Sequence, residues 1–192
     1  MVNDRDSKVD LKKIYYISQM TLDWFEMVPL QLYRYEQGNQ IMYHGMCSSE
    51  LQILNMGDRF LLIIAIANAI HYLDFLKEQL NLLGNDTYSG RVPRIIDDKE
   101  KKEIRILRNA NVHLDDYVIN KGRNQSDFIS SFTSATGISC QSDASSTIII
   151  DGEIMFGGVN ISKICNKIIK QLPTIREIVG EIQNEYVNTV MP

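Results

Sequence analysis

The strongest constraint on the fold is a long apolar stretch in the middle of the chain. Phe60–Ala67 reads FLLIIAIA, and Asp58 ahead of it is a favoured helix N-cap. Apolar residues dominate up to Leu82 or Leu83, and Gly84 follows at a position that commonly ends a helix. The uninterrupted apolar run is well short of the roughly 18 residues of a membrane span. We therefore predict a central helix buried between neighbouring helices.

The segment before this core helix supplies a first partner. Ser7 and Asp10 resemble a capping box, and apolar residues recur at helical spacing from Leu11 to Val28. Pro29 is expected to end or kink this helix. Residues 30–47 carry both helical and strand-like patterns, so their structure stays open.

Residues after the core helix predict a loop, another helix and a second loop. Residues 84–93 read GNDTYSGRVP, a composition typical of loops. Asp97 and Asp98 then suit the positive end of a third helix, which includes residues 105–117. Residues 124–147 are rich in Ser, Thr and Gly without helical periodicity, and we expect an irregular or mobile loop there.

The last part of the chain predicts a hairpin and a closing helix. Residues 146–158 contain two apolar runs joined by Asp151–Gly152, a strong two-residue turn signal. Asn160 is a suitable N-cap for the last helix. Pro173 is expected to interrupt that helix, and a T-x-x-E capping pattern restarts it as far as about Tyr186.

These elements predict a mainly all-α fold. We expect an antiparallel bundle of four or more helices with one small β-hairpin inserted before the C-terminal helix. A chain of 192 residues with 44% hydrophobic and 23% charged residues fits one soluble domain, residues 1–192.

Charge and cysteine usage favour a cytoplasmic protein. Residues 1–13 are charged where a secretory signal peptide needs an apolar segment. Cys47, Cys140 and Cys165 are odd in number and far apart, which predicts neither a disulfide framework nor a zinc site. His71 lies on the apolar core helix and is expected to be buried or half-buried. We expect no membrane attachment, no metal and no cofactor.

Residues 105–117, RILRNANVHLDDY, hold the most reactive combination in the chain. Arg108 and His113 would project about 140° apart on a helix, with Asn109 between them. A two-fold dimer would bring two copies of the pair into one cleft. Arginine binds phosphate oxygens, and histidine exchanges protons near neutral pH, so the pair suits phosphodiester cleavage. The alternative is an ordinary solvated helix face.

The R-N-x-x-x-H pattern of Arg108, Asn109 and His113, late in a helix of an all-helical domain, resembles the signature of the HEPN superfamily. Many HEPN proteins are metal-independent, dimeric endoribonucleases of toxin–antitoxin and antiviral defence systems, and others are inactive or bind only nucleotides. The resemblance implies that His113 activates a ribose 2′-hydroxyl, that Arg108 stabilises the transition state and that Asn109 orients one of them. It does not explain residues 124–158, which lie between the motif and the last helix.

The partners follow from this chemistry. A 2′-hydroxyl nucleophile makes RNA the substrate, and residues 91–123 carry nine Lys or Arg against six Asp or Glu in a chain of net charge -4. We expect Arg105 and Lys102 to bind RNA, and we expect a homodimer that an antitoxin or another regulatory protein controls. The alternative function is a non-catalytic helical binding or assembly module, in which His113 has no chemical role.

Overall fold

The structure is a computed structural model that describes residues 4–43, 49–113, 121, 129–133, 137 and 139–190. The helices are α1 (Asp4–Tyr43), α2 (Ser49–Leu82), α3 (Asp86–Ser89), α4 (Asp98–Val112) and α6 (Ile161–Val190). The strands are β1 (Ile129–Thr133), β2 (Ser139–Asp143), β3 (Thr147–Ile150), β4 (Glu153–Phe156) and β5 (Val159–Asn160).

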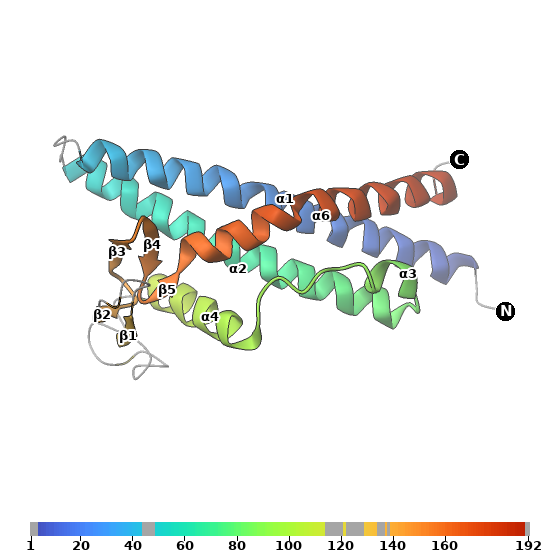
Figure 1. Ribbon diagram of the computed structural model, residues 1–192. Helices are drawn as coiled ribbons and strands as arrows, with labels where there is room; N and C mark the ends of the chain where they lie inside the picture. Colours follow the sequence, from blue (N-terminus) through green and yellow to red (C-terminus); the bar gives the residue numbers. More distant parts are fainter. Residues whose placement is uncertain are drawn as a thin grey trace.

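The helices form an antiparallel bundle around α2. Figure 1 shows α1 and α2 as a long hairpin, with α6 packed against α1 and with α4 beside α2. The strands gather at the start of α6, and the first residues of α1 and the last residues of α6 lie at the opposite end of the molecule. The prediction of a mainly helical bundle with strands before the C-terminal helix is confirmed.

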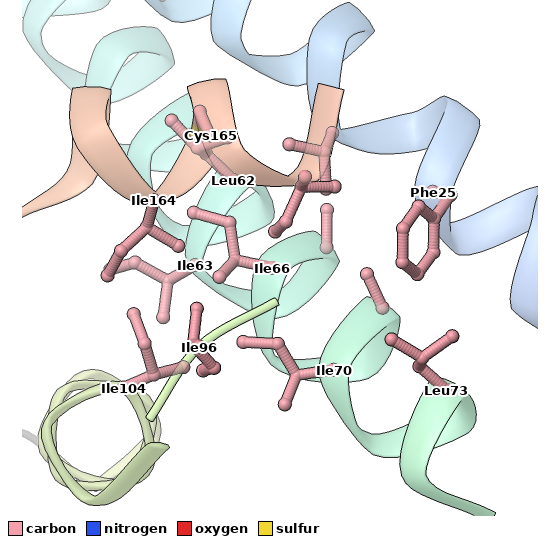
Figure 2. Close-up of a cluster of buried hydrophobic side chains, with 14 of the residues drawn as sticks. Phe25, Leu62, Ile63, Ile66, Ile70, Leu73, Ile96, Ile104, Ile164 and Cys165 are labelled. Atoms are coloured by element: carbon pink, nitrogen blue, oxygen red, sulfur yellow. The ribbon is translucent and has the colours of Figure 1, made fainter. Parts of the chain in front are cut away.

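The core lies where α1, α4 and α6 meet α2. In Figure 2, Ile63, Ile66 and Ile70 of α2 point toward side chains of the other helices, and all of these residues are buried. The same buried cluster includes Phe25 of α1, Ile104 of α4, and Ile164 and Cys165 of α6. Burying a large apolar side chain contributes about 1.5–3 kcal/mol, so these contacts fix the position of α4 on α2.

Among the described helices, α2 alone has the length and composition of a membrane span. Within Gln52–Leu82, the most apolar 18-residue window has a mean hydropathy of 1.6, and 44% of that window is buried in the molecule. Core helices of soluble proteins pass the same test.

Two helices pass through prolines that were expected to interrupt them. Pro29 was predicted to end or kink α1. The helix does not end there, because it continues to Tyr43. Buried Val28 and Tyr35 on either side of the proline hold this part of α1 in the bundle. Similarly, α6 continues through Pro173 to Val190 without a restart. Tertiary packing offsets the local cost of about 3 kcal/mol for a proline inside a helix.

The start of α2 also differs from its predicted position. The helix begins at Ser49, so Asp58 lies inside it and does not act as the N-cap. Its carboxylate instead pairs with Arg34 of α1 at 2.9 Å. The predicted end is confirmed, because α2 stops at Leu82 and Gly84 has a φ of +67°.

The predicted hairpin is present as β3 and β4, with Asp151 and Gly152 at positive φ in the turn. β5 extends it to a three-stranded antiparallel sheet, and Asn160 accepts a hydrogen bond from the backbone N–H of Lys163 at the start of α6. The expectation of an irregular loop over 124–147 is wrong for its described parts, because β1 and β2 form an antiparallel pair. Backbone hydrogen bonds between these strands need no apolar periodicity.

Candidate functional site

The helix that carries the motif is fixed at its start by a capping box. The backbone N–H of Glu100 donates to the Asp97 carboxylate at 2.8 Å, and the Glu100 carboxylate accepts from the N–H of Asp97 at 3.1 Å. The bond from Glu100 lowers the pKa of Asp97. Ile104, Leu107 and Ala110 form the buried face of α4, so the positions between them face outward.

The three predicted catalytic residues lie at the C-terminal end of α4. Arg108 is exposed and Asn109 is half-buried. His113 is the exposed C-cap residue, and its backbone N–H donates to the carbonyl of Asn109 at 3.0 Å. Neither the Arg108 guanidinium nor the His113 imidazole is bonded to another described side chain. Both are therefore available to a ligand. The rest of the motif stretch, 114–117, lies outside the described residues.

The structure brings Arg108 and Arg105 together in a groove between α2 and α4. The groove has a volume of about 350 Å³ and is lined by Ala67, Asn68, Ile70, His71 and Asp74 of α2 and by Lys101, Ile104, Arg105 and Arg108 of α4. Asn109 and His113 lie outside this lining, as does Lys102, which is exposed on another side of the helix. The groove thus joins two of the five predicted site residues.

His71 is the lining residue that sequence reasoning placed wrongly. The expectation is a buried or half-buried side chain, and His71 is exposed at the edge of the groove. α4 covers the neighbouring face of α2, where Ile70 and Leu73 are buried, and leaves His71 at the margin. Its ring is nearly parallel to that of Phe75, at 6.2 Å between centroids.

The groove is positively charged. Lys101, Arg105 and Arg108 follow one another at i, i+4 and i+7, so they form a row along one face of α4. Lys101 pairs with Asp74 at 2.7 Å. The two arginines have no ion pair or hydrogen bond within the part of the chain that the structure describes. Three cations against one carboxylate leave an excess of two positive charges.

A buried arginine holds the motif-bearing end of α4 in place. Arg59 of α2 is 8% exposed and donates to the side chain of Asn111 and, at 2.7 Å, to the carbonyl of Ala144. Its guanidinium lies 4.7 Å from the centre of the Phe156 ring. Burial lowers the pKa of Arg59. Sequence reasoning missed this residue, although Asn111 on the apolar face of α4 was a signal that a buried polar partner was needed.

The described residues offer no metal-binding group to the site. Among the described residues, no group of three His, Cys, Asp or Glu side chains could hold a metal ion. Comparison with protein-family models, with curated proteins and with solved structures finds no match to this chain. The candidate site therefore consists of the end of α4 and the groove beside it.

Proposed function

We propose that the chain is a metal-independent endoribonuclease of the HEPN type, with Arg108, Asn109 and His113 as its site. The observation that carries the proposal is that Arg108 and His113 are exposed and have no side-chain partner among the described residues. They lie at the end of a helix that Arg59 anchors, beside a groove with excess positive charge. An unpaired arginine in such a position binds phosphate without first breaking an ion pair.

In the proposed reaction, the ribose 2′-oxygen attacks the adjacent phosphorus and the bond from phosphorus to the 5′-oxygen breaks. His113 accepts the proton of the 2′-hydroxyl, and the leaving 5′-oxygen receives a proton from a second acid, for which the other His113 of a dimer is available. Arg108 stabilises the charge on the phosphorane-like transition state. The products are a 2′,3′-cyclic phosphate and a 5′-hydroxyl.

The proposal includes a cytoplasmic homodimer. Ile53 and Met56 of α2 are 68% and 66% exposed, and Val112 at the end of α4 is also exposed. The contact between Arg59 and Asn111 places this half of α2 beside the end of α4. A second copy that covers these apolar side chains would bring two sites close together. An antitoxin or another regulatory protein would act by covering the same region.

The proposal is tested by RNA cleavage in the presence of a chelator. Wild-type protein is compared with Arg108→Ala and His113→Ala, and with Lys170→Ala as a control that removes an exposed cation from α6. Both site variants should lose about 10²–10⁴-fold in rate, while the control should match wild type. Circular dichroism checks that all variants stay folded.

Cleavage that is equal in all four proteins would show that another site or a contaminant is responsible. Absence of cleavage by the wild type would reject the enzyme and favour the non-catalytic binding or assembly module.

A further inference from the structure

The groove between α2 and α4 extends beyond the residues around Arg108. A second hollow of about 260 Å³ adjoins it and shares Asp74 and Lys101 with it. This second hollow is lined by Lys77 of α2, by Arg94 of the segment before α4 and by Asp98. The two hollows thus form one track along α4, crossed by the ion pair between Lys101 and Asp74.

The charges along this track suit a linear anion. Lys101, Arg105 and Arg108 span seven residues of helix, which corresponds to about 10 Å. Within the described part of the chain, Lys101 is paired with a carboxylate and the two arginines are not. A row of cations of this length fits a chain of phosphates better than a single compact anion.

His71 adds a planar group beside the cations. Its imidazole is exposed, and Phe75 lies parallel to it and supports its orientation. Asn68, one turn earlier on α2, also lines the groove and offers an amide donor and acceptor. A ring at the margin of a basic groove is the arrangement that single-stranded nucleic acids use for base stacking.

We infer that this track carries a single RNA strand toward the end of α4, with its phosphates on Lys101, Arg105 and Arg108 and one of its bases stacked on His71. The choice of RNA as the ligand rests on the proposed function. The track itself is a binding site separate from the catalytic role of His113, since His113 does not line it.

The test measures binding without cleavage. The probe is a short single-stranded RNA with all 2′-hydroxyls methylated, which removes the nucleophile, and its affinity is followed by fluorescence anisotropy at several salt concentrations. Arg105→Gln should weaken binding and reduce the slope of log affinity against log salt by about 0.7. Lys170→Gln, the matched charge change on α6, should leave both unchanged.

The stacking contact is tested separately. His71→Ala should weaken binding by about 5- to 100-fold, and His71→Phe should restore most of it, because a phenyl ring stacks without charge. His71 is exposed, so neither change should disturb the fold, and circular dichroism checks this. Loss of affinity that His71→Phe does not restore would overturn the stacking contact.

The binding and cleavage results separate the two proposals. If wild type binds the methylated probe through Arg105 and His71 but cleaves no RNA, the RNA-binding role of the track is supported and the ribonuclease proposal is rejected. If wild type cleaves RNA and the Arg105 and His71 variants bind the probe as tightly as wild type, the RNA-binding role of the track is rejected and the ribonuclease proposal is supported. Absence of any binding by wild type would overturn the track.

Discussion

Arg59 shows how one residue links the packing of the core to the candidate site. Its charge is buried without a carboxylate in ion-pair contact among the described residues. Its two terminal nitrogens donate to Asn111 and to the carbonyl of Ala144, while its Nε has no hydrogen-bond partner among those residues. Asp143 lies close enough to raise the pKa of Arg59, but burial has the larger, opposite effect. The residue therefore stabilises the end of α4 mainly through hydrogen bonds to neutral groups and through its stacking on Phe156.

Replacement of Arg59 by methionine keeps the apolar stem but removes these donors. We expect Arg59→Met to lower the free energy of unfolding by about 1–3 kcal/mol, because the Asn111 side-chain oxygen loses its donor and the Ala144 carbonyl keeps only the Asn111 amide. The control is Arg34→Met, since Arg34 is 51% exposed in its pair with Asp58, and exposed pairs contribute at most about 1 kcal/mol. Urea denaturation measures both, and an Arg59 variant as stable as wild type would contradict the assigned role.

The ionised Asp97 cap makes the stability of the protein depend on pH at the start of α4. Its pKa is lowered in the folded protein, so its stabilising contribution is present above the unfolded pKa of about 3.9 and is lost as the pH falls through the folded pKa. Asparagine caps a helix without a charge. Asp97→Asn should therefore lose less stability than wild type between about pH 5 and pH 2. Thermal unfolding over this range measures it, and parallel pH profiles would contradict the prediction.

At the scale of elements, the sequence predicted correctly those helix ends and turns that depend only on neighbouring residues. Asp97 caps α4 through its own carboxylate, and Gly84 and the Asp151–Gly152 turn act through their own backbone conformations; all three were located correctly. The continuation of α1 through Pro29 was missed, because it depends on packing against α2. The pairing of β1 with β2 was missed because neither strand carries an apolar alternation.

The turn that presents Ala144 to Arg59 depends on Gly157. This glycine has a φ of +52°, and a Cβ atom there would lie 2.6 Å from the Cα atom of Ala144. Gly157→Ala should cost at least about 2 kcal/mol in unfolding free energy, from the backbone conformation together with the clash. Gly180→Ala is the control: nothing lies within 4 Å of its Cβ position in α6, and it should gain about 0.5–1 kcal/mol. A Gly157→Ala protein with the same free energy of unfolding as wild type, in the same denaturation experiment, would contradict this packing.

At the scale of the whole molecule, the candidate site is only partly readable from the sequence. Arg105 and Arg108 were predicted from one helix, since their spacing alone places them together. His71 and Arg59 were not, because they come from α2, and only the packing of α2 against α4 brings them to the site. Residues contributed by a distant segment leave no local pattern.

The proposed dimer gives a prediction at this scale. Met56→Glu should convert the dimer to a monomer and reduce RNA cleavage, because a charge would be placed in the apolar surface that a second copy covers. Ile149→Glu, at an exposed apolar position on β3, should leave the dimer intact. Analytical ultracentrifugation distinguishes these states. A Met56→Glu protein that remains dimeric and active would show that the dimer interface does not include Met56.

The most direct test of the proposed function is the chemistry of the RNA ends after incubation with the wild-type protein in chelator. Attack by the 2′-hydroxyl predicts fragments with 2′,3′-cyclic phosphate and 5′-hydroxyl ends, which mass spectrometry identifies, and their absence with His113→Ala. Intact RNA, or fragments with 3′-hydroxyl and 5′-phosphate ends, would contradict a metal-independent ribonuclease at the end of α4.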